Sequence, residues 1–462
     1  MKIKYITLFL AVTTLMCSCE KLIEIEDPTD SLSAEATYSS REGIKSAATG
    51  LYTGTVHSNV YYYQVPFIYY SMFSDDMNYY RANNAEYFEN TYTETTSYIN
   101  TMWTQLYKNV YQVNDFIAHI SNSSLLTDAE RRQYMGEALW FRAYDYFWLV
   151  SSWGDVPLVL SNKYEETSML PRSSTETVWQ QIISDLKTSA EYLAGTSSPK
   201  TRITSSAAIA LLARAYLYTG QWQQAIDAAN LLIPASDGGS GTSFKLETIT
   251  RVFLSSSNEA ILHFNMEGFI GSSTYVGYTR EAVFAIPTGK TVQYKLSPEL
   301  VASLQSDMSD QRNTWMGSVG TTYYPYKYKQ NTTPSSSDLY EYQIILRLAE
   351  QYLIRAEANA HLGNTEAAVS DVNVIRNRAG VADLASSLTQ EEILLAIEEE
   401  RRKEYFCEQG HRWFDLRRTG RIDAVLSQVS WKKWQSHKAL LPIPQQELNT
   451  NKNLTQNEGY AY

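Results

Sequence analysis

The sequence has few cysteine and histidine side chains. Of its 462 residues three are cysteine, two of which, Cys17 and Cys19, lie close to the N-terminus, and the six histidines are scattered singly. With Cys407 as the single cysteine of the body, a disulfide framework is excluded. The body also has no His-Glu-x-x-His, Walker loop, dinucleotide fingerprint or Cys-x-x-Cys pair. We therefore expect no cofactor and no catalytic metal, and leave open whether a structural cation is bound.

Positive charge and long apolar runs are also scarce. The chain has 39 lysines and arginines against 50 acidic residues, a net charge of −11, and no Lys/Arg-rich block. This balance argues against nucleic acid and anionic membrane surfaces as electrostatic partners. After the N-terminal segment, no apolar run approaches the length that a membrane-spanning helix needs.

The N-terminal segment is typical of an exported protein. Two lysines precede an apolar run over Tyr5–Met16, which is too short to span a bilayer and resembles a secretory signal. The following LMCSC junction is similar to a bacterial lipobox. We expect residues 1–18 to be a lipoprotein signal peptide and Cys19 to carry acyl chains, each buried CH₂ contributing about 0.8 kcal/mol to anchoring. A plain cleaved signal and modification of Cys17 are the alternatives.

Beyond the signal, composition divides the chain into a tether and a body. Residues 19–38 are acidic and lack helical periodicity through Ser33, so we expect a tether there. Residues 39–462 form the predicted single body. Helix signals in this body include two capping boxes, Thr127-Asp-Ala-Glu130 and Thr389-Gln-Glu-Glu392. Apolar periodicity predicts helices over 39–53, Trp103–Ile120, from the first capping box to Trp153, and over Thr175–Leu193.

Two stretches of the body look like copies of each other. Ala208–Ile233 aligns with Gln351–Arg376 at a constant offset, with small residues and a central glycine at the positions of a tetratricopeptide helix pair. Such pairs cannot bury their apolar faces alone and must stack with other helices. The predicted fold is therefore mainly α, a scaffold of tetratricopeptide-like helix pairs. Between the copies, residues 234–342 are predicted to be a loop-rich insertion with short β segments such as Ala260–Phe264.

Aromatic side chains are the most abundant feature. The chain has 35 tyrosines and 10 tryptophans, more than a helical core needs, and many lie in the insertion and in a second segment without clear periodicity, 55–98. An aromatic face attracts the C–H face of a sugar ring, and a phenol can hydrogen-bond its hydroxyls. We expect most of these tyrosines to be packing residues, and a minority to form a ligand platform. The candidates for that platform are Tyr79, Tyr80, Arg81, Trp315, Tyr323 and Tyr324.

The stretch Glu398–Arg418 combines charges and aromatics in an unusual way. The helix that begins at the second capping box should end at Gly410, and Arg401 falls on its apolar stripe. A buried guanidinium needs partners. We predict a structural clamp, a buried ion network held between aromatic rings, formed by Glu400, Arg401, Glu404, Arg412, Trp413, Asp415 and Arg417. Catalytic carboxylates are the alternative, disfavoured because neighbouring arginines would lower their pKa.

The same stretch carries a family resemblance. The pattern ERxxEYFxxxGxRWFDLRR, which starts at Glu400, resembles the SusD/RagB family of surface nutrient-binding lipoproteins of Bacteroidetes. The GDVPL motif at Gly154 and the C-terminal motifs that begin at Leu440 and Asn453 are similar to that family too. The resemblance implies paired acids at Ser74-Asp75-Asp76 near a ligand face, and acidic residues after Cys19 as a signal for export to the cell surface.

The resemblance also implies a function. We expect a non-catalytic, lipid-anchored outer-membrane receptor that binds a nutrient, most simply an oligo- or polysaccharide, and delivers it to a SusC-like TonB-dependent transporter. Peptide cargo is the variant within the same uptake class. A surface glycosidase and a purely structural helical-repeat adaptor are the alternatives from other classes.

Overall fold

The computed structural model describes residues 34–57, 64–79, 85–241, 243–265 and 276–461. The chain divides into two compact units, Met1–Ala47 and Ala48–Tyr462. The predicted signal peptide and Cys19 lie outside the described residues. None of the helices within these ranges is both long enough and apolar enough to cross a membrane.

The first unit contains little regular structure that is described. Helix α2 (Ala34–Tyr38) is followed by the start of α3 (Arg41–His57). Helix α2 occupies the last five residues of the segment that we expected to be a tether. Helix α3 lies where a helix was predicted and continues four residues beyond the predicted end, Thr53.

The second unit is mainly α-helical, as predicted. Helix α7 is its central element, because every residue from Gly136 to Trp153 is buried. It packs against α6 on one side and α9 on the other. The Thr127 capping box starts α7, and Gly154 at a φ of 76° ends it. The longer helices are α6 (Ser97–Ile120), α7 (Asp128–Trp153), α9 (Thr175–Tyr192), α10 (Ser205–Tyr218), α11 (Trp222–Asn230), α14 (Leu348–His361), α15 (Thr365–Ala379) and α16 (Gln390–Tyr405).

Short helices and strands complete this unit. The short helices are α4 (Gln64–Phe73), α5 (Ala85–Phe88), α8 (Tyr164–Thr167), α12 (Arg280–Ala285), α13 (Pro298–Gln305), α17 (His411–Arg418), α18 (Ile422–Leu426) and α19 (Gln445–Thr450). The strands are β1 (Met77–Tyr79), β2 (Ala260–Phe264), β3 (Tyr294–Leu296), β4 (Met316–Val319), β5 (Thr322–Pro325) and β6 (Gln343–Arg347). They form three antiparallel pairs within the described residues, β1 with β3, β2 with β6 and β4 with β5. The predicted strand Ala260–Phe264 is confirmed as β2.

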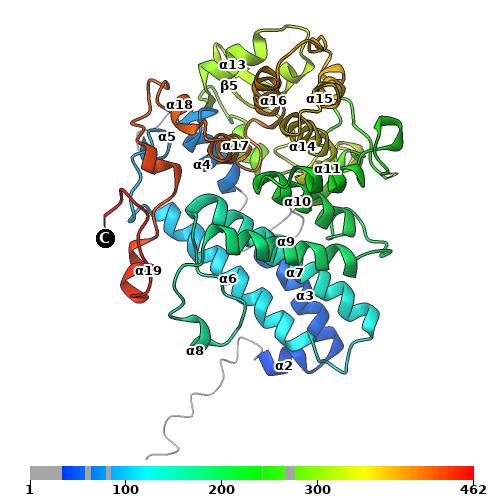
Figure 1. The fold of residues 1–462 in the computed structure, drawn as a ribbon, viewed down its shortest axis with the longest axis vertical. Coiled ribbons are helices and arrows are strands. Elements are labelled where there is room, and N and C mark those ends of the chain that lie inside the picture. The colour runs from blue at the N-terminus through cyan, green and yellow to red at the C-terminus, as the bar shows by residue number, and fades with distance from the viewer. Residues whose placement is uncertain (1–33, 58–63, 80–84, 242, 266–275, 462) are drawn as a thin grey trace, which may run out of the picture. The chain divides into compact units, whose positions relative to one another are not determined.

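The two predicted repeats are helix pairs, and they are neighbours. Helices α10 and α11 are joined through Gly220, α14 and α15 through Gly363, and both glycines have a positive φ. Helix α11 packs against α14, and α14 and α15 pack against α16 (Figure 1). Arg214 of α10 and Glu350 of α14, both almost fully buried, form a salt bridge of 2.6 Å between the pairs. Stacking therefore reunites repeats that the insertion separates in the sequence.

Two boundaries differ from the prediction. The segment 55–98 is not simply loop-rich, because α4 lies within it and buries Phe67, Tyr70 and Phe73. Helix α16 begins at its capping box as expected but ends at Tyr405, not at Gly410. The turn after it contains two non-glycine residues with positive φ, Cys407 and Gln409, and Gly410 instead precedes α17. The buried contacts of this turn, not the glycine, decide where the helix ends.

Candidate functional site

Two short strands bring two tyrosines together that are far apart in the sequence. Strand β1 pairs with β3 so that Tyr79 lies opposite Tyr294. Their ring centroids are 5.1 Å apart, with a tilt of 43°. Tyr294 is nearly buried and Tyr79 is half-buried, so the pair has one ring in the protein and one partly at its surface.

The β4–β5 hairpin adds two more tyrosines beside this pair. Strand β5 lies next to β3 and carries Tyr323 and Tyr324, both half-buried. The ring of Tyr324 covers Gly317 on β4, since a Cβ built at that glycine would lie 2.2 Å from the ring. The hydroxyl of Tyr323 accepts a hydrogen bond of 2.9 Å from the side-chain amide of Gln305. We call Tyr79, Tyr294, Tyr323 and Tyr324 the tyrosine surface.

The tyrosine surface has the chemistry to bind a neutral, hydroxyl-rich ligand. Burial raises the pKa of Tyr294 and of Tyr324, so both phenols are uncharged at neutral pH. Uncharged phenols offer an aromatic face for C–H groups and a hydroxyl for hydrogen bonds. These side chains lie on strands, which hold them in place more firmly than open loops would.

The structure gathers some of the predicted ligand residues and separates others. Tyr79, Tyr323 and Tyr324 come from both predicted segments, on strands β1 and β5, which both lie next to β3. Tyr323 and Tyr324 are consecutive residues of β5, so their side chains point to opposite faces of the strand. Tyr80 and Arg81 lie outside the described residues. Trp315 must be removed from the set, because it is 1% exposed and its indole N–H donates to the carbonyl oxygen of Ile249 at 3.1 Å.

The acidic pair before β1 is buried in ion pairs. Arg412 donates to both oxygens of Asp75 at 2.7 and 3.0 Å, and Arg402 lies 2.9 Å from the same carboxylate. Burial alone would raise the pKa of Asp75, but Arg402 and Arg412 outweigh it and hold the pKa below its usual range. Asp76 accepts from the backbone N–H of Cys407. Their loop does lead into β1, but these carboxylates serve the scaffold and are not offered to a ligand.

The predicted clamp contains a buried ion cluster around Glu404. This carboxylate is fully buried and binds three arginines, Arg347 and Arg378 at 2.5 Å each and Arg312 at 3.3 Å. Burial by itself raises the pKa of Glu404, but the three arginines outweigh it and hold the pKa well below the usual range. Glu400, one turn earlier, binds Arg312 at 2.6 Å. We call Glu404, Glu400, Arg312, Arg347 and Arg378 the ion cluster.

Sequence reasoning missed the arginines of the ion cluster. Arg312 follows α13, Arg347 ends β6 and Arg378 lies in the last turn of α15. They are far from Glu404 in sequence, and nothing local distinguishes them from surface arginines. The apolar run of β6 just before Arg347 was the one available signal, because it places this arginine at the end of a buried strand.

The predicted clamp residues Arg401, Trp413 and Asp415 lie outside the ion cluster. Arg401 donates to Asp415 at 2.7 Å, and Asp415 also binds Arg418. Trp413 is fully buried and packs near Phe73. Among the described residues, no group of three or more His, Cys, Asp or Glu side chains is arranged to hold a metal ion.

Arg417 differs from its predicted role in the ion network. Its guanidinium donates to the backbone carbonyls of Val150 and Ser151 near the end of α7. Burial lowers the pKa of Arg417 to about 10, which leaves it charged at neutral pH. The carbonyl of Val150 also accepts from the backbone N–H of Gly154, and a cation at this end of α7 complements the helix dipole. Arg417 therefore stabilises the end of α7.

Family models match both halves of the chain. Residues 275–460 match the model described as the SusD family, and residues 24–217 match the model described as starch-binding, associating with the outer membrane. A SusD-like protein of Formosa agariphila is 24% identical, over 94% of this chain and 95% of its own length. The starch-binding protein SusD of Bacteroides thetaiotaomicron is 34% identical over 123 residues, 25% of this chain and 21% of its own.

Solved structures have the same fold. A SusD superfamily protein from Bacteroides vulgatus superposes with a TM-score of 0.77 at 21% identity, covering 91% of this chain and 99% of its own. A laminarin-binding SusD-like protein superposes with a TM-score of 0.71 at 24% identity, covering 91% of this chain and all of its own. The two family models, which match residues 24–217 and 275–460, and the SusD-like relatives support the assignment of the chain to the SusD family.

Proposed function

We propose that this protein is a non-catalytic carbohydrate-binding protein, and that the tyrosine surface holds its ligand. The observation that carries the proposal is that strands from two distant segments, β1 and β5, lie beside β3 and carry the half-buried Tyr79, Tyr323 and Tyr324. The family models and relatives support the ligand class, because one model is described as starch-binding, one relative as a starch-binding protein and one neighbour as laminarin-binding.

In this mechanism a tyrosine ring on the exposed face of the strands binds one face of a saccharide, while phenol hydroxyls fix its orientation. Tyr323 and Tyr324 are held by Gln305 and Gly317, so little conformational entropy is lost when the ligand binds. The ligand is bound without bond cleavage. We further propose that Cys19 carries the lipid anchor at the outer membrane and that the bound glycan passes to a SusC-like TonB-dependent transporter.

Titration calorimetry of the chain from Glu20 onward, against starch, laminarin and a panel of other glycans and peptides, tests this proposal. Tyr324→Ala should weaken binding of the recognised glycan about ten-fold, because one stacked ring contributes roughly 0.5–1.5 kcal/mol beyond its buried area. Tyr111→Ala is the matched control, since Tyr111 lies on α6 and is 53% exposed. Equal affinity of Tyr324→Ala and the control would remove the tyrosine surface from the site.

A peptide-uptake protein and a glycosidase would each give a different result in the same measurement. Saturable binding of a peptide and of no glycan would identify a peptide-uptake member of the family. Heat that continues after saturation, accompanied by new reducing ends, would identify a glycosidase.

A further inference from the structure

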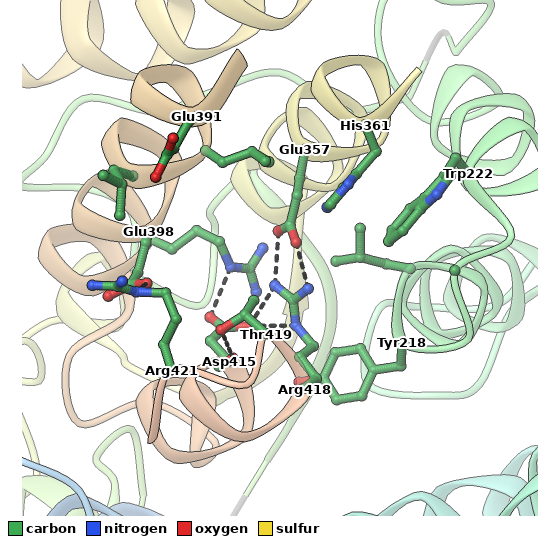
Figure 2. A pocket seen from close by; sticks show the side chains of 15 residues that line it. Tyr218, Trp222, Glu357, His361, Glu391, Glu398, Asp415, Arg418, Thr419 and Arg421 are labelled. Carbon is green, nitrogen blue, oxygen red and sulfur yellow. Dashed lines mark hydrogen bonds and ion pairs between the residues drawn. The ribbon is translucent and has the colours of Figure 1, made fainter. Parts of the chain in front are cut away.

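A cavity lies within the helical scaffold, apart from the tyrosine surface. It has a volume of about 500 Å³ and is enclosed by the ends of α10 and α11, by α14 and by α16 and α17 (Figure 2). It shares no lining residue with the tyrosine surface. This volume is within the range of small-molecule sites.

One wall of the cavity is aromatic and apolar. Trp222 of α11 and His361 of α14 stack face to face, with ring centroids 4.0 Å apart and an angle of 8° between planes (Figure 2). Burial lowers the pKa of His361, so this imidazole is neutral at neutral pH. Leu394 and Leu395 of α16 line the cavity as well, and Leu395 is 42% exposed. This combination suits a ligand with an apolar face.

The charged groups at the floor of the cavity mostly satisfy one another. Arg418 donates to both oxygens of Glu357, at 2.5 and 2.7 Å, and to Asp415 at 2.9 Å (Figure 2). Arg421 donates to Glu398 at 2.5 Å. None of these carboxylates needs a positively charged ligand for neutralisation.

Two side chains that line the cavity, Arg401 and Tyr218, have donor atoms without acceptors among the described residues. Arg401 uses its Nε atom on Asp415, but its Nη1 and Nη2 atoms, in a side chain that is 2% exposed, have no hydrogen-bond partner among the described residues. The hydroxyl of Tyr218 is likewise enclosed and without a partner in the described part of the chain. Buried polar groups are normally paired, and leaving them unpaired costs stability. The cavity therefore lacks hydrogen-bond acceptors.

The charge of the lining determines which acceptor fits. Three arginines line the cavity, Arg401, Arg418 and Arg421, against four carboxylates, Glu357, Glu391, Glu398 and Asp415. Arg412, behind the lining, also binds Glu398 at 3.2 Å, so the charges at the cavity are balanced and neither an anionic nor a cationic ligand is favoured. Hydroxyl, ether or carbonyl oxygens would supply acceptors without added charge. An apolar face combined with uncharged oxygens is the chemistry of a neutral saccharide ring.

We propose that this cavity, formed by the helical repeats around Trp222, Tyr218 and Arg401, is a second binding site that takes one uncharged saccharide unit. The ligand class rests on the proposed carbohydrate-binding function, whereas the site itself rests on the unpaired donors and the aromatic wall. The ring packs on the stacked Trp222 and His361, and its oxygens accept from Arg401 and Tyr218. A glycan could thus be held at two separate places on one chain.

Saturation-transfer NMR and calorimetry with methyl β-glucoside and glucuronate as probes test this second site. Trp222→Ala should weaken methyl glucoside binding about five-fold, and Tyr218→Phe, which removes only the unpaired hydroxyl, should weaken it about two-fold. Tyr324→Ala should leave the signal from this cavity unchanged. Thermal melting of each variant verifies that it is folded.

The outcomes separate this proposal from the first one. Methyl glucoside binding that is sensitive to Tyr324→Ala and indifferent to Trp222→Ala and Tyr218→Phe would overturn the cavity site and leave the tyrosine surface standing. Stronger binding of glucuronate than of methyl glucoside at the cavity would overturn the neutral ligand class. Failure of every sugar and glycan to bind would remove both sites.

Discussion

The ion cluster and the tyrosine surface are built by the same long-range contacts but use them in opposite ways. Around Glu404 each charge is enclosed by an opposite charge, and Arg312, Arg347 and Glu404 are at most 2% exposed. In the tyrosine surface, half-buried rings are held by neighbours and keep part of their area open. The charged motif therefore secures the scaffold, whereas the half-buried tyrosines keep part of their ring area exposed.

Breaking the ion cluster should have the largest effect. Glu404→Gln keeps the shape of the side chain but leaves Arg312, Arg347 and Arg378 without their shared carboxylate. Loss of one partner of a buried ion pair typically costs 3–5 kcal/mol, so we expect a decrease of about this size in the free energy of unfolding. Urea denaturation measures it.

Glu366→Gln on the exposed surface of α15 is the control and should change the free energy of unfolding by less than about 0.5 kcal/mol. If both variants were equally stable, the ion cluster would have no role in holding the scaffold together.

Glu281 is a buried carboxyl without an arginine partner within the described residues, and its pKa is raised, whereas the arginines around Glu404 lower the pKa of that carboxyl. Burial raises the pKa of Glu281 to about 8, and its carboxylate accepts from the amide of Gln343. Between about pH 4.5 and 8 the folded state holds a proton that the unfolded state has lost, so this group makes the protein less stable as pH rises. Glu281→Gln does not titrate and should gain about 4 kcal/mol relative to the wild type between pH 5 and pH 8.5.

Chemical denaturation at the two pH values measures this difference. A constant difference between Glu281→Gln and the wild type would show that the folded-state carboxyl titrates normally.

The tyrosine surface should respond through binding more than through stability. Gly317→Ala places a Cβ against the ring of Tyr324 and forces the ring to move. We expect glycan affinity to fall about ten-fold and the free energy of unfolding to fall by about 1 kcal/mol, because the hairpin is short and lies at the surface. Calorimetry and thermal melting measure the two quantities.

Gly289→Ala is the matched control, since a Cβ there meets no atom within 4 Å. Unchanged affinity of Gly317→Ala would mean that the position of the Tyr324 ring does not matter for the ligand.

Local signals were sufficient for most of the scaffold and insufficient for the sites. The capping boxes at Thr127 and Thr389 and the apolar periodicity of the repeats act over a few turns of helix, so they could be predicted. Burial of Arg401 followed from its place on an apolar stripe. Its partners across the fold could not be derived, because ion pairs between distant segments leave no periodic pattern.

The lack of a local signal also explains why buried and exposed aromatic residues could not be told apart in the sequence. Trp315 and Tyr324 lie in one irregular segment of similar composition, and only the packing of Phe253 and Ile249 against Trp315 separates a core ring from a surface ring. Tyr294 was missed because it became relevant only through strand pairing with Tyr79.

The salt bridge between Arg214 and Glu350 has a consequence for how such a protein can diversify. It joins the first helix of each pair, α10 and α14, directly, although the insertion separates the two pairs in the sequence. Because the cost of closing a loop rises only slowly with its length, residues can be added, lost or exchanged between the pairs without disturbing the joint. Natural selection can therefore change the segment between the helix pairs while the helical scaffold stays the same.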